Sequence, residues 1–209
     1  YFEMAAQDIR SLPKLEGTVH VNMALVIKFM ANYFFNPGQF PEIPKRDDPA
    51  DDTFLFHQGP TRGLGKIQFH DFNLAYNSVD MPNVNIFKEQ IGVFQQFLVN
   101  APPDAQQAKN IDFLLAVGEI FTLVAYGQLI IEKYQIEKFE DDLLEQIFDF
   151  MVRDFSRYAL QLYSKADTTE NQMQWCTKMI RKPVDDHERF LRFWENHVYA
   201  LKDTYEMTP

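Results

Sequence analysis

The sequence has little of what several protein classes require. It holds one cysteine, Cys176, among 209 residues, which excludes a disulfide framework and fits a reducing compartment such as the cytoplasm. It has no dense cluster of Lys or Arg, and its formal net charge is -10, so we expect neither a nucleic-acid partner nor docking on anionic lipid. It begins at Tyr1 without a basic stretch followed by an apolar run, so we predict no signal peptide.

Metal ligands and phosphate loops are also missing. The five histidines are scattered and form no recognised ligand pair, so we predict no metal site. The glycine-rich stretch 59–66 lacks the Ser or Thr that follows the lysine of a phosphate loop, and we interpret it as a surface turn. The chain is instead rich in apolar residues, at 46%, and contains 20 Phe, which predicts an ordered protein with aromatic packing.

Apolar residues recur at the 3.6-residue spacing of amphipathic helices along most of the chain. We therefore predict an all-α fold. A first helix over 1–12 is expected to be interrupted by Pro13. The further predicted helices cover 19–35, 85–100, 104–134, 140–165, 169–181 and 184–203. In the last of them, we expect an inward apolar stripe made of Phe190, Leu191, Trp194, Val198 and Leu201.

The segment between residues 36 and 84 has a different character. Its density of proline and glycine excludes long helices, whereas its interleaved aromatics indicate that it packs against other parts of the chain. We predict an ordered but irregular segment with one short hairpin near 53–71. The predicted domains are residues 1–36 as the end of a core helical bundle, 37–84 as the connecting segment, and 85–209 as an appended helical-bundle domain.

Residues 111–131 form the longest apolar run and are long enough to cross a membrane. Glu119 lies near the middle of this run, and a central carboxylate costs about 3 kcal/mol on membrane insertion. We therefore predict a central helix buried in a bundle, without membrane insertion. Glu119 then needs a partner, because an unpaired buried carboxylate is costly. Small residues such as Gly118 and Gly127 are expected to permit close helix approach.

One short segment carries most of the functional information. Residues 8–22 read DIRSLPKLEGTVHVN, so that a turn with Asp and Arg leads to Leu-Glu-Gly-Thr and then to an apolar helix. This arrangement resembles the segment of acyl-CoA dehydrogenases that carries their catalytic base. The resemblance covers residues 1–35. Residues 85–205 are similar to the helical C-terminal extension found in the longer members of that family.

The resemblance implies a role for each residue of the motif. Glu16 is the expected catalytic base that removes the proton α to the thioester carbonyl, and Gly17 is expected to contact the acyl-CoA substrate. A partly desolvated carboxylate suits this step, because burial raises its pKa toward the working pH. Thr18, Val19 and His20 are expected to lie along the FAD cofactor, which accepts the hydride.

The motif departs from the family pattern at two positions. Leu15 stands where an aromatic residue is frequent, and His20 stands where a glutamine commonly faces the flavin. Both departures concern flavin contacts rather than the base. The resemblance also implies upstream domains that complete the flavin site. We therefore expect this chain to be the C-terminal part of a larger cytoplasmic enzyme, inactive alone, and to form a homodimer or higher homo-oligomer.

Two other functions fit the same residues. Helices with extensive apolar faces also suit a non-catalytic interaction or dimerisation module that binds a partner chain. An aromatic-rich bundle also suits a self-contained protein that holds a lipid-like ligand in a cavity. The first alternative predicts normal partner binding after Glu16 is changed, and the second predicts that the chain copurifies with a ligand.

Overall fold

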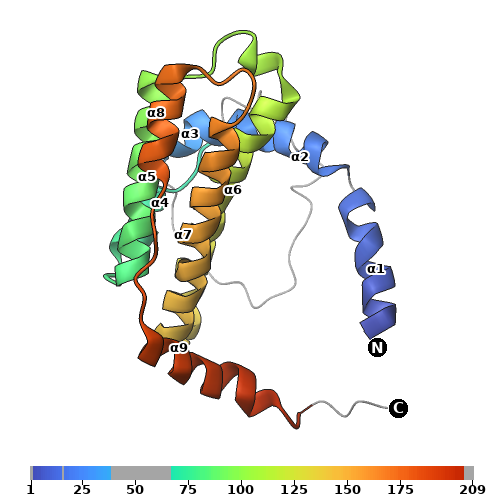
Figure 1. The fold of residues 1–209 in the computed structure, drawn as a ribbon, viewed down its shortest axis with the longest axis vertical. Coiled ribbons are helices and arrows are strands. Elements are labelled where there is room, and N and C mark those ends of the chain that lie inside the picture. Colours follow the sequence, from blue (N-terminus) through green and yellow to red (C-terminus); the bar gives the residue numbers. More distant parts are fainter. Residues whose placement is uncertain (1, 16, 39–66, 205–209) are drawn as a thin grey trace, which may run out of the picture.

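The computed structural model describes residues 2–15, 17–38 and 67–204. Every regular element among these residues is a helix, so the predicted all-α fold is confirmed. Four helices form an upright bundle (Figure 1). These are α5 (Pro82–Asn100), α6 (Ile111–Glu137), α7 (Asp141–Tyr163) and α8 (Glu170–Met179).

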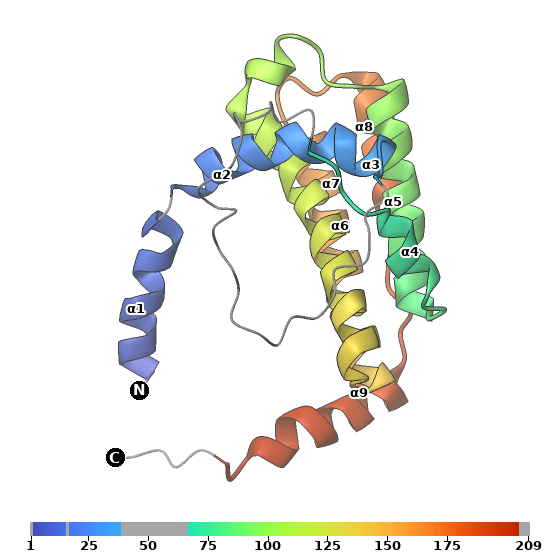
Figure 2. The ribbon, with the colours of Figure 1, turned by 180° about the vertical axis from the view of Figure 1, so that it is seen from behind.

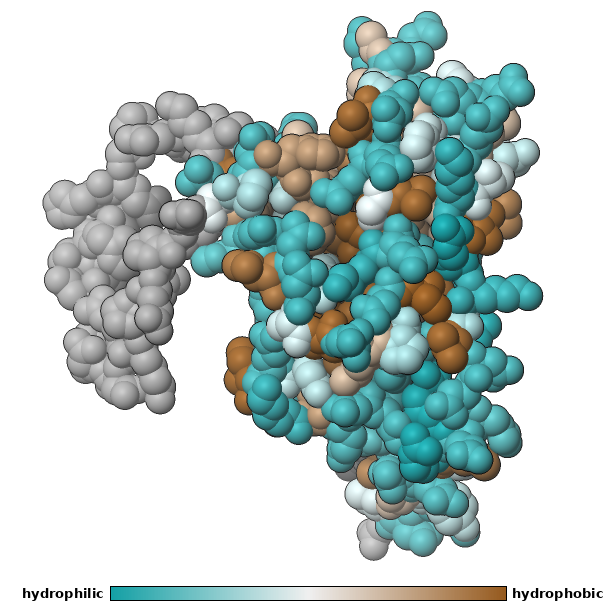
Figure 3. Space-filling view, turned by 90° about the vertical axis from the view of Figure 1, so that its left-hand side faces the viewer, coloured by the Kyte–Doolittle hydropathy of each residue, from teal (hydrophilic) through white to brown (hydrophobic). Residues whose placement is uncertain are grey.

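The bundle core is built largely from aromatic side chains. Phe87 and Phe94 of α5 are fully buried, and each meets Phe155 of α7 edge-on, with ring centroids 5.5 and 6.3 Å apart. Such T-shaped pairs add to the free energy that burial of the rings already supplies. The side of the bundle formed by α5 and α8 is largely hydrophilic on its outer surface (Figure 3), so these helices bury one face and present the other to water.

Local sequence signals mark the start of three of the four bundle helices. Pro82 occupies the first turn of α5, where a missing N–H costs no hydrogen bond. Asn110 accepts hydrogen bonds from the first turn of α6, and Thr169 forms a reciprocal capping box at the start of α8. Helix α6 begins at Ile111 rather than near 104, because the Asp104 side chain accepts two backbone N–H groups and closes a separate turn.

The N-terminal helices cross the bundle instead of forming a separate core. Helix α2 (Val19–Val26), the 3-10 turn η1 (Ile27–Phe29) and α3 (Met30–Phe35) run continuously over α6. Tyr33 and Phe34 are buried in the same core as the bundle. The packing therefore joins residues 19–35 to the bundle, while the division of the chain at residues 36 and 84 stays a prediction.

Helix α1 (Phe2–Leu15) stands away from the bundle in both ribbon views (Figures 1 and 2). The helix runs through Pro13 and ends at Leu15, so the expected interruption is wrong. Pro13 lies in the last turn, where its missing N–H removes one hydrogen bond from a helix that is already ending.

Two glycines of α6 allow close packing, as predicted. A Cβ on Gly118 would overlap the side chain of Met23, and one on Gly127 would overlap the Tyr76 hydroxyl and lie 3.0 Å from Met151 Cε. The first contact seats α2 on α6. The second seats α6 against α4 (Phe72–Asn77) and α7.

Helix α6 has the length and composition of a membrane-spanning helix, and 50% of its most apolar window is buried inside the bundle. Glu119 is half-buried there, and its Oε2 has no hydrogen-bond partner among the described residues. Burial raises the pKa of Glu119, whereas Lys165, Arg157 and a hydrogen bond with Gln161 lower it. The predicted partner of this carboxylate is therefore a set of modest, partly exposed contacts.

The segment predicted to be irregular contains α4, a short helix that the sequence pattern did not reveal. Asp71 caps this helix by accepting the backbone N–H of Asn73 at 2.9 Å. Phe72 and Tyr76 of α4 are buried in the core. The predicted hairpin near 53–71 falls mainly outside the described residues.

The chain ends in a C-terminal arm, which we define as α9 (His187–Phe193), the π-helical turn η5 (Trp194–Val198) and the 3-10 turn η6 (Tyr199–Leu201). The arm extends sideways from the foot of α7 (Figures 1 and 2). The expected inward apolar stripe is wrong. Its members are 39% to 46% exposed, and they are Phe190, Leu191, Trp194, Val198 and Leu201.

Two ion pairs explain why this stripe faces outward. Arg189 Nη1 lies 3.0 Å from Glu145 Oε2, and both side chains are buried. Arg192 Nε lies 2.7 Å from Asp142 Oδ2. Arg189 and Arg192 are three residues apart and share one face of α9. Because this face is fixed against α7, the apolar stripe points the other way.

Candidate functional site

The turn that carries the predicted catalytic motif joins α1 to α2. Helix α1 ends at Leu15, and Glu16, the predicted base, lies outside the described residues. Thr18 caps α2 by accepting the backbone N–H of Val21 at 3.5 Å. Gly17 and Thr18 therefore lie between two helices, whereas the role predicted for Glu16 falls outside the described residues.

Gly17 has a backbone conformation that glycine adopts readily. Its φ angle is 100°, in a region that residues with a side chain rarely occupy. A Cβ at this position would also lie 3.2 Å from Asn22 Oδ1. The Asn22 side chain donates to the Gly17 carbonyl at 3.4 Å and closes the turn. This bend requires glycine.

The residues predicted to line the flavin are exposed. Val19 is 53% exposed, and Thr18 and His20 are exposed beside it. None of the three lines either of the two cavities described below. The side chains of Thr18, Val19 and His20 are therefore exposed on the surface of the described residues.

Six of the eight residues of helix α2 are apolar, the exceptions being His20 and Asn22, but no residue in it is buried. Met23 and Val26 are half-buried on the face that meets α6. Val21 and Leu25, on another face, are 62% and 47% exposed. These two side chains lie one helical turn apart, so α2 carries a small exposed apolar strip.

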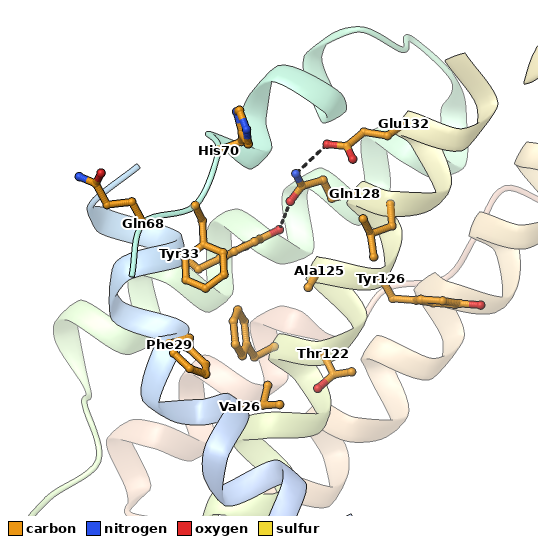
Figure 4. A pocket seen from close by; sticks show the side chains of 13 residues that line it. Val26, Phe29, Tyr33, Gln68, His70, Thr122, Ala125, Tyr126, Gln128 and Glu132 are labelled. Carbon is orange, nitrogen blue, oxygen red and sulfur yellow. Dashed lines mark hydrogen bonds between the residues drawn. The ribbon is translucent and has the colours of Figure 1, made fainter. Parts of the chain in front are cut away.

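A groove of about 700 Å³ opens between η1 and α3 on one side and α6 on the other (Figure 4). Residues 68–70 form a third wall. Most of its lining is apolar or aromatic, which leaves few polar atoms within reach of an occupant. The groove is lined by Val26, Phe29, Tyr33, Gln68, Phe69, His70, Phe121, Thr122, Ala125, Tyr126, Gln128, Leu129 and Glu132.

A chain of hydrogen bonds runs along one edge of the groove (Figure 4). Tyr33 donates its hydroxyl to Gln128 Oε1 at 2.6 Å, and Gln128 Nε2 donates to Glu132 Oε1 at 2.8 Å. Burial raises the pKa of Tyr33, and the nearby carboxylates of Glu132 and Asp71 raise it further. Tyr33 therefore stays protonated at neutral pH and donates its O–H to Gln128. The hydrogen bonds thus run from Tyr33 through Gln128 to Glu132.

A smaller cavity of about 470 Å³ lies beside α9, next to the buried pair of Arg189 and Glu145. Glu145 also accepts the backbone N–H of Asn83 at 3.2 Å, at the start of α5. Burial raises the pKa of Glu145, while the Asn83 N–H and Arg189 lower it. Arg153 pairs with Asp149 at 2.7 Å on the rim. This network fixes α5, α7 and α9 to one another, which is a structural task.

Cys176 is a packing residue. It is fully buried in α8, and burial raises the pKa of its thiol to about 12. A thiol with that pKa is protonated at neutral pH and is therefore a poor nucleophile.

Sequence reasoning missed the groove. Its polar edge combines Tyr33 with Gln128 and Glu132, which lie 95 or more residues further along the chain. The spacing of Gln128 and Glu132, one helical turn apart, was visible in the sequence. Nothing in the sequence placed Tyr33 opposite them, because that depends on how α3 crosses α6.

Comparison with known proteins adds no relative. No family model matches the sequence, and neither the curated proteins nor the solved structures give a match. The resemblance of residues 8–22 to acyl-CoA dehydrogenases therefore stays a prediction that stands on those residues.

Proposed function

We propose that this chain is the C-terminal part of an FAD-dependent acyl-CoA dehydrogenase of the longer type. In this proposal, Glu16 removes the α-proton of an acyl-CoA thioester during α,β-dehydrogenation. The proposal is supported by one local observation above all. Gly17 and Thr18 of the Leu-Glu-Gly-Thr motif lie between α1 and α2, with Gly17 at a φ angle of 100° and Thr18 capping the helix that follows.

The bend suits a catalytic base for two physical reasons. Gly17 has no side chain, so a thioester could approach the backbone closely beside Glu16. Glu16 follows Leu15, the last residue of α1, and precedes Gly17 in the sequence. Once the surrounding protein excludes water, its carboxylate would have a raised pKa and a short path to the α-carbon.

The cofactor in this proposal is FAD, which accepts a hydride from the β-carbon when it is bound. Thr18, Val19 and His20 would form one edge of its site, because they are exposed at the start of α2. A helix N-terminus favours anionic groups such as the flavin diphosphate.

The exposed apolar face of α2 indicates what completes the site. Val21 and Leu25 are exposed, and they lie one helical turn apart on a helix in which six of eight residues are apolar. We propose that the remainder of the enzyme chain covers this face. The same contact would place the substrate and flavin beside the bend and would remove water from Glu16.

The intact enzyme that carries this chain provides the test. Acyl-CoA added without oxygen should bleach the flavin absorbance of the unaltered enzyme. Glu16→Gln should keep the flavin bound and slow bleaching by about 10³-fold, a typical effect of losing a general base. Glu3→Gln, a matched change on an exposed residue of α1, should bleach normally. Bleaching at the normal rate by Glu16→Gln would remove Glu16 from the mechanism, and an intact protein without flavin would end the whole proposal.

A second candidate is a non-catalytic module for interaction or dimerisation. The observation that favours it is the C-terminal arm, whose apolar stripe includes Trp194 at 46% exposed and Leu191 at 46% exposed. Sedimentation of the 209-residue chain would separate the two functions. If Leu191→Glu with Trp194→Glu dissociates a dimer and leaves flavin bleaching of the intact enzyme unchanged, the arm serves assembly. If the chain sediments as a monomer at all concentrations, this role is excluded.

A further inference from the structure

We propose that the groove between α3 and α6 binds an amphiphile with an apolar tail and a positively charged, hydrogen-bond-donating head. This site is separate from the proposed catalytic bend. Val26, the first groove residue along the chain, lies seven positions beyond Val19 at the start of α2, which is about 10 Å along the helix. None of residues 17–20 lines the groove.

The dimensions and walls of the groove suit a small molecule. Its volume of about 700 Å³ falls inside the range of roughly 300–1,000 Å³ that is usual for ligand pockets. Phe29 and Phe121 form aromatic walls, and Ala125 leaves room on the α6 side. Leu129 forms part of the rim and is 59% exposed. A linear hydrocarbon tail would bury apolar surface on both helices at once.

The direction of the hydrogen bonds decides which head group fits. Tyr33 gives its only O–H to Gln128, and Gln128 gives an N–H to Glu132. The O–H of Tyr33 and one N–H of Gln128 thus point toward Glu132, which as a carboxylate can only accept. The unused capacity on Glu132 is therefore acceptor capacity, beside the second N–H of Gln128. A head group that donates hydrogen bonds to Glu132 completes the chain.

The charge around the groove favours the same head. Glu132 contributes a carboxylate to the lining, and no Lys or Arg is among the residues that line it. Lys133, the next residue, lies 3.6 Å from Glu137 on the outer surface and is committed there. Asp71 adds negative charge near Tyr33, as its effect on the Tyr33 hydroxyl shows. An ammonium head is attracted to this edge and a carboxylate head is repelled.

Three ligands with the same tail test the proposal on the 209-residue chain. Octylamine, octanol and octanoate differ only in the head, and isothermal titration calorimetry measures their binding. We expect one saturable site, with octylamine bound about tenfold more tightly than octanoate, because one head is attracted and the other repelled. Octanol should fall between them. Equal affinity for octylamine and octanoate, or no saturable binding of octylamine, would overturn the proposal.

Substitutions locate the site and its charge preference. Ala125→Trp fills the groove and should abolish binding of all three ligands. Leu129→Lys, at an exposed position that leaves the core intact, should weaken octylamine at least fivefold. Glu132→Gln should reduce the preference for octylamine over octanoate to below about threefold, while Glu137→Gln, which has the same charge change outside the groove, should preserve it.

The same variants expose the competing occupants. Octylamine binding that survives both Ala125→Trp and Leu129→Lys would place the site elsewhere and overturn the proposal. A dimer that excludes octylamine, and that Leu129→Lys dissociates on sedimentation, would assign the groove to a second copy of the chain and would also overturn it. Because none of these variants touches Glu16, flavin bleaching of the intact enzyme should be the same in all of them, whichever way the catalytic proposal is decided.

Discussion

The bundle and its two flanking segments use similar residues in opposite ways. In the bundle, apolar faces meet one another, and Phe87, Phe94 and Phe155 are fully buried. In α2 and the C-terminal arm, residues of the same kind stay accessible, with Leu25 47% and Trp194 46% exposed. Helical spacing of apolar residues therefore predicts an apolar helix face, but it does not predict whether that face is buried against another helix.

Polar contacts determine which face of the C-terminal arm packs against α7. The arm has an apolar stripe and a charged face, and either face could lie toward α7. Arg189 and Glu145 form a buried pair with 3.0 Å between their atoms, and Asn83 at the start of α5 also donates to Glu145. A charge buried in this way strongly resists losing its partner. The network therefore selects the charged face for contact and leaves the stripe outside.

The largest expected effect separates two phenylalanines. Phe87→Ala removes a fully buried ring that contacts Phe148 and Phe155, and it should lower the free energy of unfolding by about 4 kcal/mol. Phe190→Ala removes a ring that is 41% exposed on the arm, and it should cost under about 1 kcal/mol. Urea denaturation of the 209-residue chain measures both. Equal losses in the free energy of unfolding would show that the arm is covered in solution.

The next effect concerns the anchor of the arm. Arg189→Met leaves the buried Glu145 carboxylate without its cation and should cost about 3 kcal/mol in urea denaturation. Arg192→Met removes the pair with Asp142 near the surface and should change the stability only slightly. If Glu145→Leu combined with Arg189→Met restores most of the loss, the cost comes from the unpaired charge. A double variant as unstable as Arg189→Met would assign it to packing instead.

The sequence could predict the elements of the bundle because their signals are local. Helical spacing is readable within a few residues, although α5 begins at Pro82 and α6 at Ile111 rather than at the predicted 85 and 104. Gly17 and Thr18 at the bend belong to the same class, since a permissive residue and a capping residue act on their own neighbours.

The features that could not be predicted depend on distant partners. The orientation of the arm rests on Glu145, 44 residues from Arg189. The groove rests on Tyr33 meeting Gln128, 95 residues away. Pro13 shows a different limit, because a proline near the end of a helix and one that splits a helix look alike in a sequence.

A third prediction compares two glycines in the bundle helices, Gly127 in α6 and Gly92 in α5. Gly127→Ala places a methyl group against the Tyr76 hydroxyl, which is held by its 2.7 Å hydrogen bond to the Val124 carbonyl, so we expect a loss of about 2 kcal/mol. Gly92→Ala on α5 has no atom within 4 Å of the new methyl group. It should raise the stability by about 0.5–1 kcal/mol through better helix propensity. If Gly127→Ala leaves the stability unchanged, α4 packs less tightly against α6 at Tyr76 than the structure shows.

The smallest effect tests the boundary between buried and exposed within α6 itself. Burial raises the pKa of Glu119 above its ordinary value of 4.5. The Glu119 carboxyl group therefore holds its proton more tightly in the folded chain than in the unfolded chain. At pH values above 4.5, the ionised carboxylate opposes folding. Glu119→Gln should raise the stability at pH 7 by less than about 1 kcal/mol, since water screens a half-exposed group. Below pH 4.5 the difference should vanish, because Glu119 is then protonated in both states.

The control is Glu137→Gln on the same helix, where the carboxylate is exposed and pairs with Lys133 at 3.6 Å. That variant should leave the stability at pH 7 unchanged or slightly lower. A Glu119→Gln chain that is less stable than the unaltered chain at pH 7 would mean that Lys165, Arg157 and Gln161 outweigh the cost of burial. Glu119 would then be a paired core residue, and the apolar run of α6 would be stabilised by burial in the same way as the rest of the bundle.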